Sequence, residues 1–400
     1  MNSLAKKQPN RTVILAACVI IMLCLGIIYM WSIFSKYVCA FYGWELSQVS
    51  LTSSIMFAAF VVGIIFGGKL QPKIGAKITT IIGTLLFAGG IFLTSLIPAA
   101  YPWLLYITYG ILAGFGVGMG YACALACSQA WFPDKRGFAS GITLSTFGLS
   151  VVLFSPIAES LLNNYDPPTT FRIFALIFFV ICFAAALLIK DKIIEETSIE
   201  GDLQTEAVKQ YKPGEMIKSK YFYQITTILL CTAPAYLIII PILRPLGELR
   251  GLPSNLAVFS VMLVGICGCV GRFIIGSLSD KIGRKYALIT TSTITIISSL
   301  LLISITGIGF LVVTAAIGFA YGGLTALIPP TAGDYFGVKY VASNVGCIML
   351  GAAFSSIFFP LFINSLSPGN VDYASYFIIP AITGAIALVC VLFMKNKQTV

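Results

Sequence analysis

Histidine is absent from this chain of 400 residues, and charged residues make up only 10% of it. Histidine is the side chain that most readily exchanges protons near neutral pH, and it is also the commonest metal ligand. Its absence, together with the scarcity of carboxylates within apolar stretches, argues against an enzyme. We expect no catalytic residue, no metal site and no cofactor.

Cysteine occurs at 11 positions, but not in a pattern that binds a metal ion. The C-x-x-x-C at 123–127 and the C-x-C at 267–269 have no histidine to complete a ligand set, and both lie in apolar surroundings. We interpret the cysteines as free thiols that act as small packing residues.

Long polar stretches are also rare, because 58% of the residues are hydrophobic and the mean hydropathy is +0.95. This composition excludes a soluble globular protein. A helix that crosses a bilayer needs about 20 mostly apolar residues. Stretches of this kind predict twelve membrane-spanning helices, at 12–36, 48–68, 77–97, 102–130, 138–162, 170–190, 222–246, 254–278, 286–305, 308–332, 341–365 and 374–394. Their unbroken apolar runs rule out a membrane β-barrel, so the predicted fold class is an all-α membrane protein.

Lysine and arginine are distributed unevenly between the ends of these predicted helices. Basic residues near helix ends are retained on the cytoplasmic side of a membrane. With the N-terminus inside, 20 of the 25 basic residues fall on the cytoplasmic side and four on the outer side, while Arg272 falls within a span. We therefore expect an integral protein of a bacterial inner (plasma) membrane with both termini in the cytoplasm. The net charge of +10 then faces anionic lipid, and no nucleic-acid partner is needed to explain it.

The chain divides into two halves joined by a polar segment. Residues 191–221 are rich in Glu and Lys, and we interpret them as a cytoplasmic linker between a six-helix bundle at 1–190 and a second at 222–400. A repeat supports this division, since G-K-L-Q-P-K-I-G-A-K at 68–77 is similar to G-S-L-S-D-K-I-G-R-K at 276–285. We expect the protein to be a monomer in the lipid bilayer.

The same motifs carry a resemblance to a known family. G-S-L-S-D-K-I-G-R-K and the duplicated six-helix plan resemble the major facilitator superfamily. The strings F-Y-G-W-E-L-S-Q-V-S at 41–50 and W-F-P-D-K-R-G-F-A-S-G at 131–141, with Arg272, resemble the oxalate/formate antiporter family, a relative of the monocarboxylate transporters. The resemblance implies the major facilitator fold and secondary active transport of a small organic anion by alternating access.

Charged residues in the loops are the predicted gating elements. Asp280 lies where a predicted helix ends and can approach a helix N-terminus, while Arg284 and Lys285 can pair with carboxylates or with orphan carbonyl groups at helix C-termini. We expect these residues, with Asp134 and Arg136 of the segment 131–141, to hold the two halves together in one state of the cycle. The alternative is that the basic residues serve only to orient the helices.

Arg272 is the residue on which the substrate prediction depends. It lies eight residues before Asp280, which is about 12 Å along a helix, and a charge at that depth is costly unless it faces a cavity or a partner. No acidic residue lies deep in the second half. A guanidinium without an acid favours an anionic ligand, because its paired N–H groups match a carboxylate. The alternative is a structural arginine bonded to backbone carbonyl groups.

Hydroxyl groups within the spans are the other candidate substrate ligands. Tyr29, Tyr121 and Tyr321 lie in three predicted helices, and Thr325 lies one turn from Tyr321. A buried phenol needs a partner and can donate a hydrogen bond to a carboxylate. The resemblance adds weight, since related anion exchangers place cavity aromatics at matching positions. Glu159, near the outer end of its span, could serve in gating or have no function, and we favour no function.

Two departures from the resembled families narrow the substrate. Oxalate carriers place a lysine where this chain has Ala352, and proton-coupled monocarboxylate carriers place an aspartate where it has Gly268. A single cation suits a monoanion, so we expect a monocarboxylate such as formate, lactate or pyruvate. Symport with a proton, exchange against a counter-anion and uniport all stay open.

Other classes of membrane protein fit less well. A drug exporter is expected to carry a deep acidic residue and a purely apolar cavity, and a sugar carrier many amides, so Arg272 argues against both. A non-transporting membrane sensor would need a larger soluble segment than 191–221.

Overall fold

The computed structural model describes residues 10–132, 136–190, 210–337, 340–366 and 373–394, and within these ranges the regular structure is entirely helical. Ten helices are long and apolar enough to cross a membrane. Two further predicted spans correspond to α13 (Arg284–Leu301), which is rich in Ser and Thr, and to α16 (Tyr373–Leu392), whose apolar part is shorter.

The first half of the chain forms one group of helices, which we call the first group. It contains α1 (Arg11–Leu25), the 3-10 helix η1 (Gly26–Tyr29), α2 (Trp31–Tyr42), α3 (Leu46–Ile74), α4 (Ala76–Thr94), the π-helix η2 (Tyr106–Ala113), α5 (Gly114–Trp131), α6 (Arg136–Asn164) and α7 (Pro167–Leu188).

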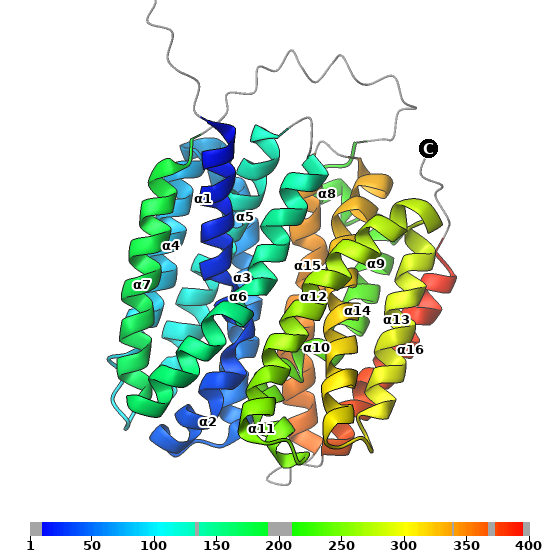
Figure 1. Ribbon diagram of the computed structural model, residues 1–400. Coiled ribbons are helices and arrows are strands. Elements are labelled where there is room, and N and C mark those ends of the chain that lie inside the picture. The colour runs from blue at the N-terminus through cyan, green and yellow to red at the C-terminus, as the bar shows by residue number, and fades with distance from the viewer. Residues whose placement is uncertain (1–9, 133–135, 191–209, 338–339, 367–372, 395–400) are drawn as a thin grey trace, which may run out of the picture.

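The second group lies beside the first (Figure 1). It contains α8 (Pro213–Met216), α9 (Lys220–Thr232), α10 (Pro234–Leu237), η5 (Ile240–Ile242), α11 (Leu243–Leu249), α12 (Ser254–Ile282), α13, α14 (Ile308–Phe336), α15 (Val341–Leu366) and α16. The two groups meet along two seams, where α3 packs against α15 and α6 packs against α12.

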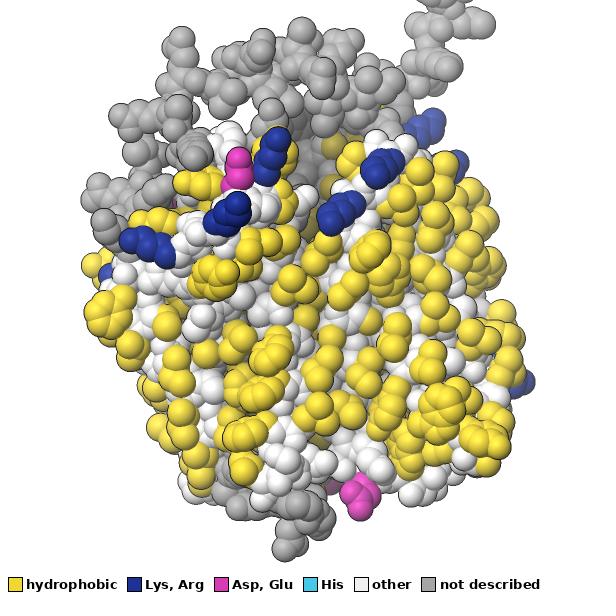
Figure 2. Space-filling view, turned by 180° about the vertical axis from the view of Figure 1, so that it is seen from behind, with side chains coloured by type: hydrophobic (Ala, Val, Ile, Leu, Met, Phe, Trp, Pro, Cys, Tyr) yellow, Lys and Arg dark blue, Asp and Glu magenta, His cyan; other side chains and the backbone are white. Residues whose placement is uncertain are grey.

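The two ends of the helical array differ in charge. Helix α1 begins at the end drawn uppermost in Figure 1, where α3 and α12 finish with Lys73 and Lys281 in their last turns. Lys and Arg side chains gather at this end in Figure 2, above a broad hydrophobic flank. We call it the basic face and the other end the opposite face. Apolar side chains of α12 and α14 such as Phe273 and Val312 are strongly exposed, as expected for helices that face lipid.

The sequence repeat is also a repeat of backbone geometry. Gly75 ends α3 with φ 88° and ψ 156°, and Gly283 ends α12 with φ 89° and ψ 152°. A positive φ of this size strains any residue with a Cβ atom, which accounts for glycine in both copies. Helices α3 and α12 have the same length, 29 residues, so the repeated loops end equivalent helices.

The predicted helix at 12–36 is wrong in one respect, because two helices occupy this region. A Cβ atom on Gly26 would lie 1.9 Å from the carbonyl oxygen of Phe147, so only glycine allows η1 to pack this closely on α6. The chain tightens into a 3-10 turn at this contact and resumes as α2 at Trp31. The turn brings Tyr29 to the centre of the molecule.

The predicted helix at 222–246 is interrupted by its prolines. It consists of α9, α10, η5 and α11, with Pro234 beginning α10 and Pro241 within η5. Proline cannot donate a helical hydrogen bond, which explains the breaks. The bent segment positions two residues that sequence analysis did not single out, Tyr236 and Arg244.

Candidate functional site

A cavity of about 310 Å³ lies between the two groups and contains all five residues predicted to contact substrate. Its lining includes Arg272 of α12, Tyr29 of η1, Tyr121 of α5, and Tyr321 and Thr325 of α14. It extends toward the basic face, because residues from the last turns of α3 and α5 and the first residue of α15 also line it, namely Gln71, Pro72, Gln129 and Val341.

Arg272 reaches from the second group toward the first. A Cβ atom built on Gly148 of α6 would lie 2.7 Å from an Nη atom of Arg272, so glycine leaves the space that the guanidinium occupies. A smaller void beside the guanidinium is lined by Gly148, Gly265 and Gly268 among others. No carboxylate of the described residues forms an ion pair with Arg272.

Tyrosine side chains surround the guanidinium. Tyr29, Tyr236 and Tyr321 line the same small void as Arg272. The ring of Tyr321 stacks on that of Tyr236, with centroids 4.0 Å apart and planes 6° from parallel, and Tyr29 meets Tyr236 edge to face at 5.7 Å. Such ring contacts hold the three tyrosine side chains together beside Arg272.

Tyr236 is a member of this cluster that sequence analysis missed. Its position between Pro234 and Pro241 was the available signal, because prolines within a membrane helix accompany irregular backbone at ligand sites. The stacking of its ring on Tyr321 was not readable from the sequence, since the two residues are 85 positions apart.

Tyr121 belongs to the wall contributed by the first group. Its ring contacts Phe60 at 5.2 Å and Phe147 at 5.2 Å, and Phe147 in turn contacts Tyr29 at 5.4 Å. These aromatic rings connect α3, α5 and α6 to η1 around one end of the cavity. Tyr121 lines the same cavity as Arg272.

Thr325 lines the cavity, but its hydroxyl proton is already used in a hydrogen bond within α14. Its hydroxyl group donates to the carbonyl oxygen of Gly322, one turn earlier in α14, at 2.9 Å. Only the oxygen lone pairs then remain for another partner.

A buried ion pair that sequence analysis failed to predict joins the two groups near the opposite face. Arg244 of α11 is 1% exposed, and its two terminal nitrogens donate to the two carboxylate oxygens of Glu159 in α6, at 2.5 and 2.8 Å. Arg244 also donates to the carbonyl oxygen of Ile33 and lies over the ring of Tyr37 at 5.2 Å. Leaving Glu159 without a role was therefore wrong, because this carboxylate links the two groups.

The same contact shows that Arg272 is not the one arginine inside the protein, because Arg244 is buried as well. Arg244 lies at the α6–α12 seam, where α2 and α6 cover it, and it is the more deeply buried of the two arginines. A second ion pair joins the groups beside it, between Lys36 of α2 and Glu248 of α11 at 2.9 Å. Glu248 also approaches Nε of Arg244 at 3.5 Å.

The predicted gating residues at the basic face pair within the second group. Arg284 contacts Asp280 at 2.6 Å and Asp334 at 3.2 Å, and Lys285 donates to the carbonyl oxygen of Leu392 at 2.7 Å. These contacts connect α12, α13, α14 and α16 to each other. Asp134 lies outside the described residues, and the structure does not describe the side chain of Arg136.

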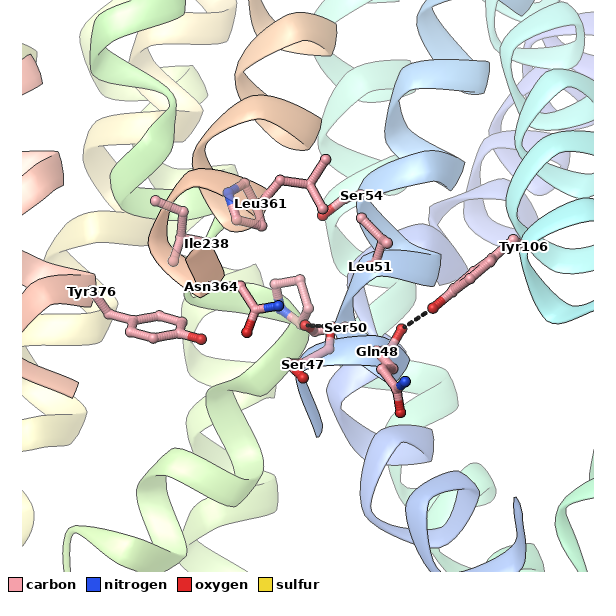
Figure 3. A pocket seen from close by; sticks show the side chains of 12 residues that line it. Ser47, Gln48, Ser50, Leu51, Ser54, Tyr106, Ile238, Leu361, Asn364 and Tyr376 are labelled. Atoms are coloured by element: carbon pink, nitrogen blue, oxygen red, sulfur yellow. Dashed lines mark hydrogen bonds between the residues drawn. The ribbon is translucent and has the colours of Figure 1, made fainter. Parts of the chain in front are cut away.

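A smaller pocket of about 70 Å³ opens at the opposite face, beside the α3–α15 seam (Figure 3). Polar side chains from both groups line it, including Ser47, Ser50 and Ser54 of α3 and Asn364 of α15. The hydroxyl group of Tyr106 donates to the carbonyl oxygen of Gln48 at its edge, as drawn in Figure 3. It carries no charged side chain and is separate from the cavity at Arg272.

Comparison with known proteins assigns the chain to a family. The sequence model of the Major Facilitator Superfamily matches residues 14–309 and 262–399, which together span nearly the whole chain. The chain belongs to the major facilitator superfamily. It is therefore a membrane transporter and not an enzyme, and the resemblance stated from the sequence is confirmed.

Individual members of the superfamily resemble the chain at moderate identity. The oxalate:formate antiporter of Oxalobacter formigenes is 29% identical over 97% of this chain and 92% of its own length. The uncharacterized MFS-type transporter YhjX of Escherichia coli is 26% identical over 88% of this chain and 87% of its own length. The partially occluded inward-open structure of the xylose transporter XylE from E. coli matches 98% of this chain and 99% of its own at 16% identity, with a TM-score of 0.73, which shows the same fold.

Proposed function

We propose that this major facilitator transports a small monocarboxylate by alternating access, with Arg272 as the residue that binds the carboxylate. The observation that carries the proposal is the position of Arg272 on a cavity between the two groups, with tyrosines around it and no acidic partner among the described residues. A carboxylate can accept two parallel hydrogen bonds from the guanidinium and more from the phenols. The similarity to the oxalate:formate antiporter supports an anionic substrate.

The proposed membrane arrangement has twelve spans in two six-helix bundles, with residues 191–221 as the linker and both termini in the cytoplasm of a bacterium. The basic face is then the cytoplasmic face, in agreement with the location of Lys73, Lys281 and Lys285. In this orientation the cavity faces the cytoplasm, and Arg244–Glu159 and Lys36–Glu248 close the outer side.

In the opposite state of the cycle, the outer ion pairs open and the inner ends of the groups come together. Asp280, Arg284 and Lys285 belong to the proposed inner latch, with Asp134 and Arg136 as candidates in the first half. Their contacts within the second group fit a state in which the inner latch is released. Such exchange of contacts between two packed arrangements is the physical basis of alternating access.

Uptake into proteoliposomes tests the proposal. Vesicles containing the purified protein are offered labelled formate, lactate, pyruvate or oxalate, with and without a pH gradient or a preloaded counter-anion. Saturable uptake of a monocarboxylate is expected, and its response to the two gradients separates symport, exchange and uniport. Uptake equal to that of protein-free vesicles for all four anions would contradict the proposal.

A further inference from the structure

The cavity at Arg272 is polar at one end and apolar over most of its walls. On the side of the first group, its lining includes Phe60 and Ile64 of α3 and Leu144 of α6. On the side of the second group, it includes Leu229 of α9 together with residues of α14 and α15, namely Ile328, Val345, Met349 and Ala352. A ligand whose carboxylate lies on Arg272 therefore extends between two apolar walls.

The cavity provides one positive charge, which can neutralise one carboxylate group. Among the described residues that line it, Arg272 is the one with a charged side chain. The amides of Gln71 and Gln129 lie near the basic face, and Gln129 follows Tyr121 by eight residues of α5, which is about 12 Å along the helix. A second carboxylate placed between these two ends would lose its water and gain no cation, which is costly.

The cavity is also large for the smallest carboxylates. One water molecule needs about 10–15 Å³ of such volume, so 310 Å³ far exceeds the space that the three heavy atoms of formate fill. With formate bound, the apolar walls stay in contact with water. A longer apolar tail replaces that water, and closure of the two groups brings both walls onto it.

We infer that the preferred substrates are monocarboxylates with an apolar tail of several carbon atoms, and not formate or a dicarboxylate. The inference rests on the proposed function, because it takes Arg272 as the carboxylate ligand. A 2-oxo or 2-hydroxy oxygen beside the carboxylate fits the same end of the cavity, because Tyr29, Tyr121 and Tyr321 line it together with Arg272 and each phenol can donate a hydrogen bond.

A series of 2-oxo acids tests the inference by binding to the purified full chain. The probes are pyruvate, 2-oxobutyrate, 4-methyl-2-oxopentanoate and phenylpyruvate, with oxalate as the dianion, and calorimetry gives each dissociation constant. Each buried methylene group is expected to tighten binding by about fourfold. Phenylpyruvate should bind at least about tenfold more tightly than pyruvate, and oxalate more weakly than pyruvate.

Matched variants of α6 locate the effect. Leu144→Asn places an amide in the apolar wall and is expected to reduce the ratio of phenylpyruvate to pyruvate affinity by about tenfold. Leu149→Asn makes the same change on the same helix at a side chain that is 40% exposed and away from the cavity, and it should keep the wild-type ratio.

Ala352→Lys, in α15, adds a second cation to the lining. It should reverse the order of affinities, so that oxalate binds more tightly than phenylpyruvate.

The outcomes separate this inference from the function on which it rests. Affinities that are equal along the series, or that fall with tail length, overturn the inference. If that binding still depends on Arg272, the proposed function stands. An unchanged affinity ratio in Leu144→Asn also overturns it. Absence of binding for every carboxylate overturns both.

Discussion

Arg272 and Arg244 lie in neighbouring helices of the second group, but their surroundings differ. Both point toward the first group, but Arg244 meets the carboxylate of Glu159 and Arg272 meets the edge of a cavity. Arg244 is neutralised by the protein itself, while the charge of Arg272 has tyrosine hydroxyl groups and space beside it. An arginine is available to an anionic ligand when the fold leaves space beside the guanidinium, places other hydrogen-bond donors around that space and provides no acidic side chain.

The two sites also differ in what breaking them does. Removing one partner of a buried ion pair leaves the other charge without compensation, whereas removing a cation that has no acid leaves no buried charge behind. Changes at Arg244 should therefore lower stability and loosen the opposite face, and changes at Arg272 should lower affinity.

The largest effect is expected for Arg244→Gln. This variant leaves Glu159 unpaired at the α6–α12 seam, which costs about 3–5 kcal/mol of folding free energy, and its thermal unfolding midpoint should fall clearly below that of the wild type. The double variant Arg244→Gln with Glu159→Gln should recover most of the loss, because neither charge remains. The control Arg272→Gln should leave the unfolding midpoint close to that of the wild type. Equal losses in the two single variants would contradict the distinction between the arginines.

An intermediate effect is expected for Arg272→Lys. Lysine keeps the charge but not the paired donors, so a loss of about 1.5–3 kcal/mol in carboxylate binding is expected, which corresponds to roughly a 10- to 100-fold rise in the dissociation constant. Uptake of labelled pyruvate into proteoliposomes and calorimetry measure the loss. Arg172→Lys, at an exposed position of α7, is the matched control and should transport normally. Near-normal uptake by Arg272→Lys would remove the proposed binding site.

The smallest effect is expected for Lys36→Ala. The side chain of Lys36 is 49% exposed, and an ion pair in that setting contributes only about 0.2–1 kcal/mol. The unfolding midpoint should fall slightly in dilute buffer, and high salt should reduce the difference because exposed charges are screened. A loss as large as that of Arg244→Gln, or one insensitive to salt, would mean that the Lys36–Glu248 pair acts as part of the buried cluster.

The membrane helices and several of the residues that line the cavity were predictable from the sequence. Runs of apolar residues predict membrane helices wherever they occur, and the depth of Arg272 follows from its distance to Asp280 along a single helix. Tyr29, Tyr121 and Tyr321, which line the cavity, were selected because they lie within predicted spans and because related anion exchangers place aromatic residues at matching positions. Tyr236 was not selected, because several prolines break its helix and a regular helical projection no longer indicates where the ring points.

Local sequence is enough to predict a bundle of membrane helices with one deep cation in the middle of a span. Apolar stretches require lipid, and a helix satisfies its own backbone, so neither depends on a distant partner. Which arginine is neutralised depends instead on how the helices pack. Arg244 and Glu159 are 85 positions apart, and they become an ion pair because the packing of the two groups brings α11 onto α6, whereas the same packing leaves a cavity beside Arg272.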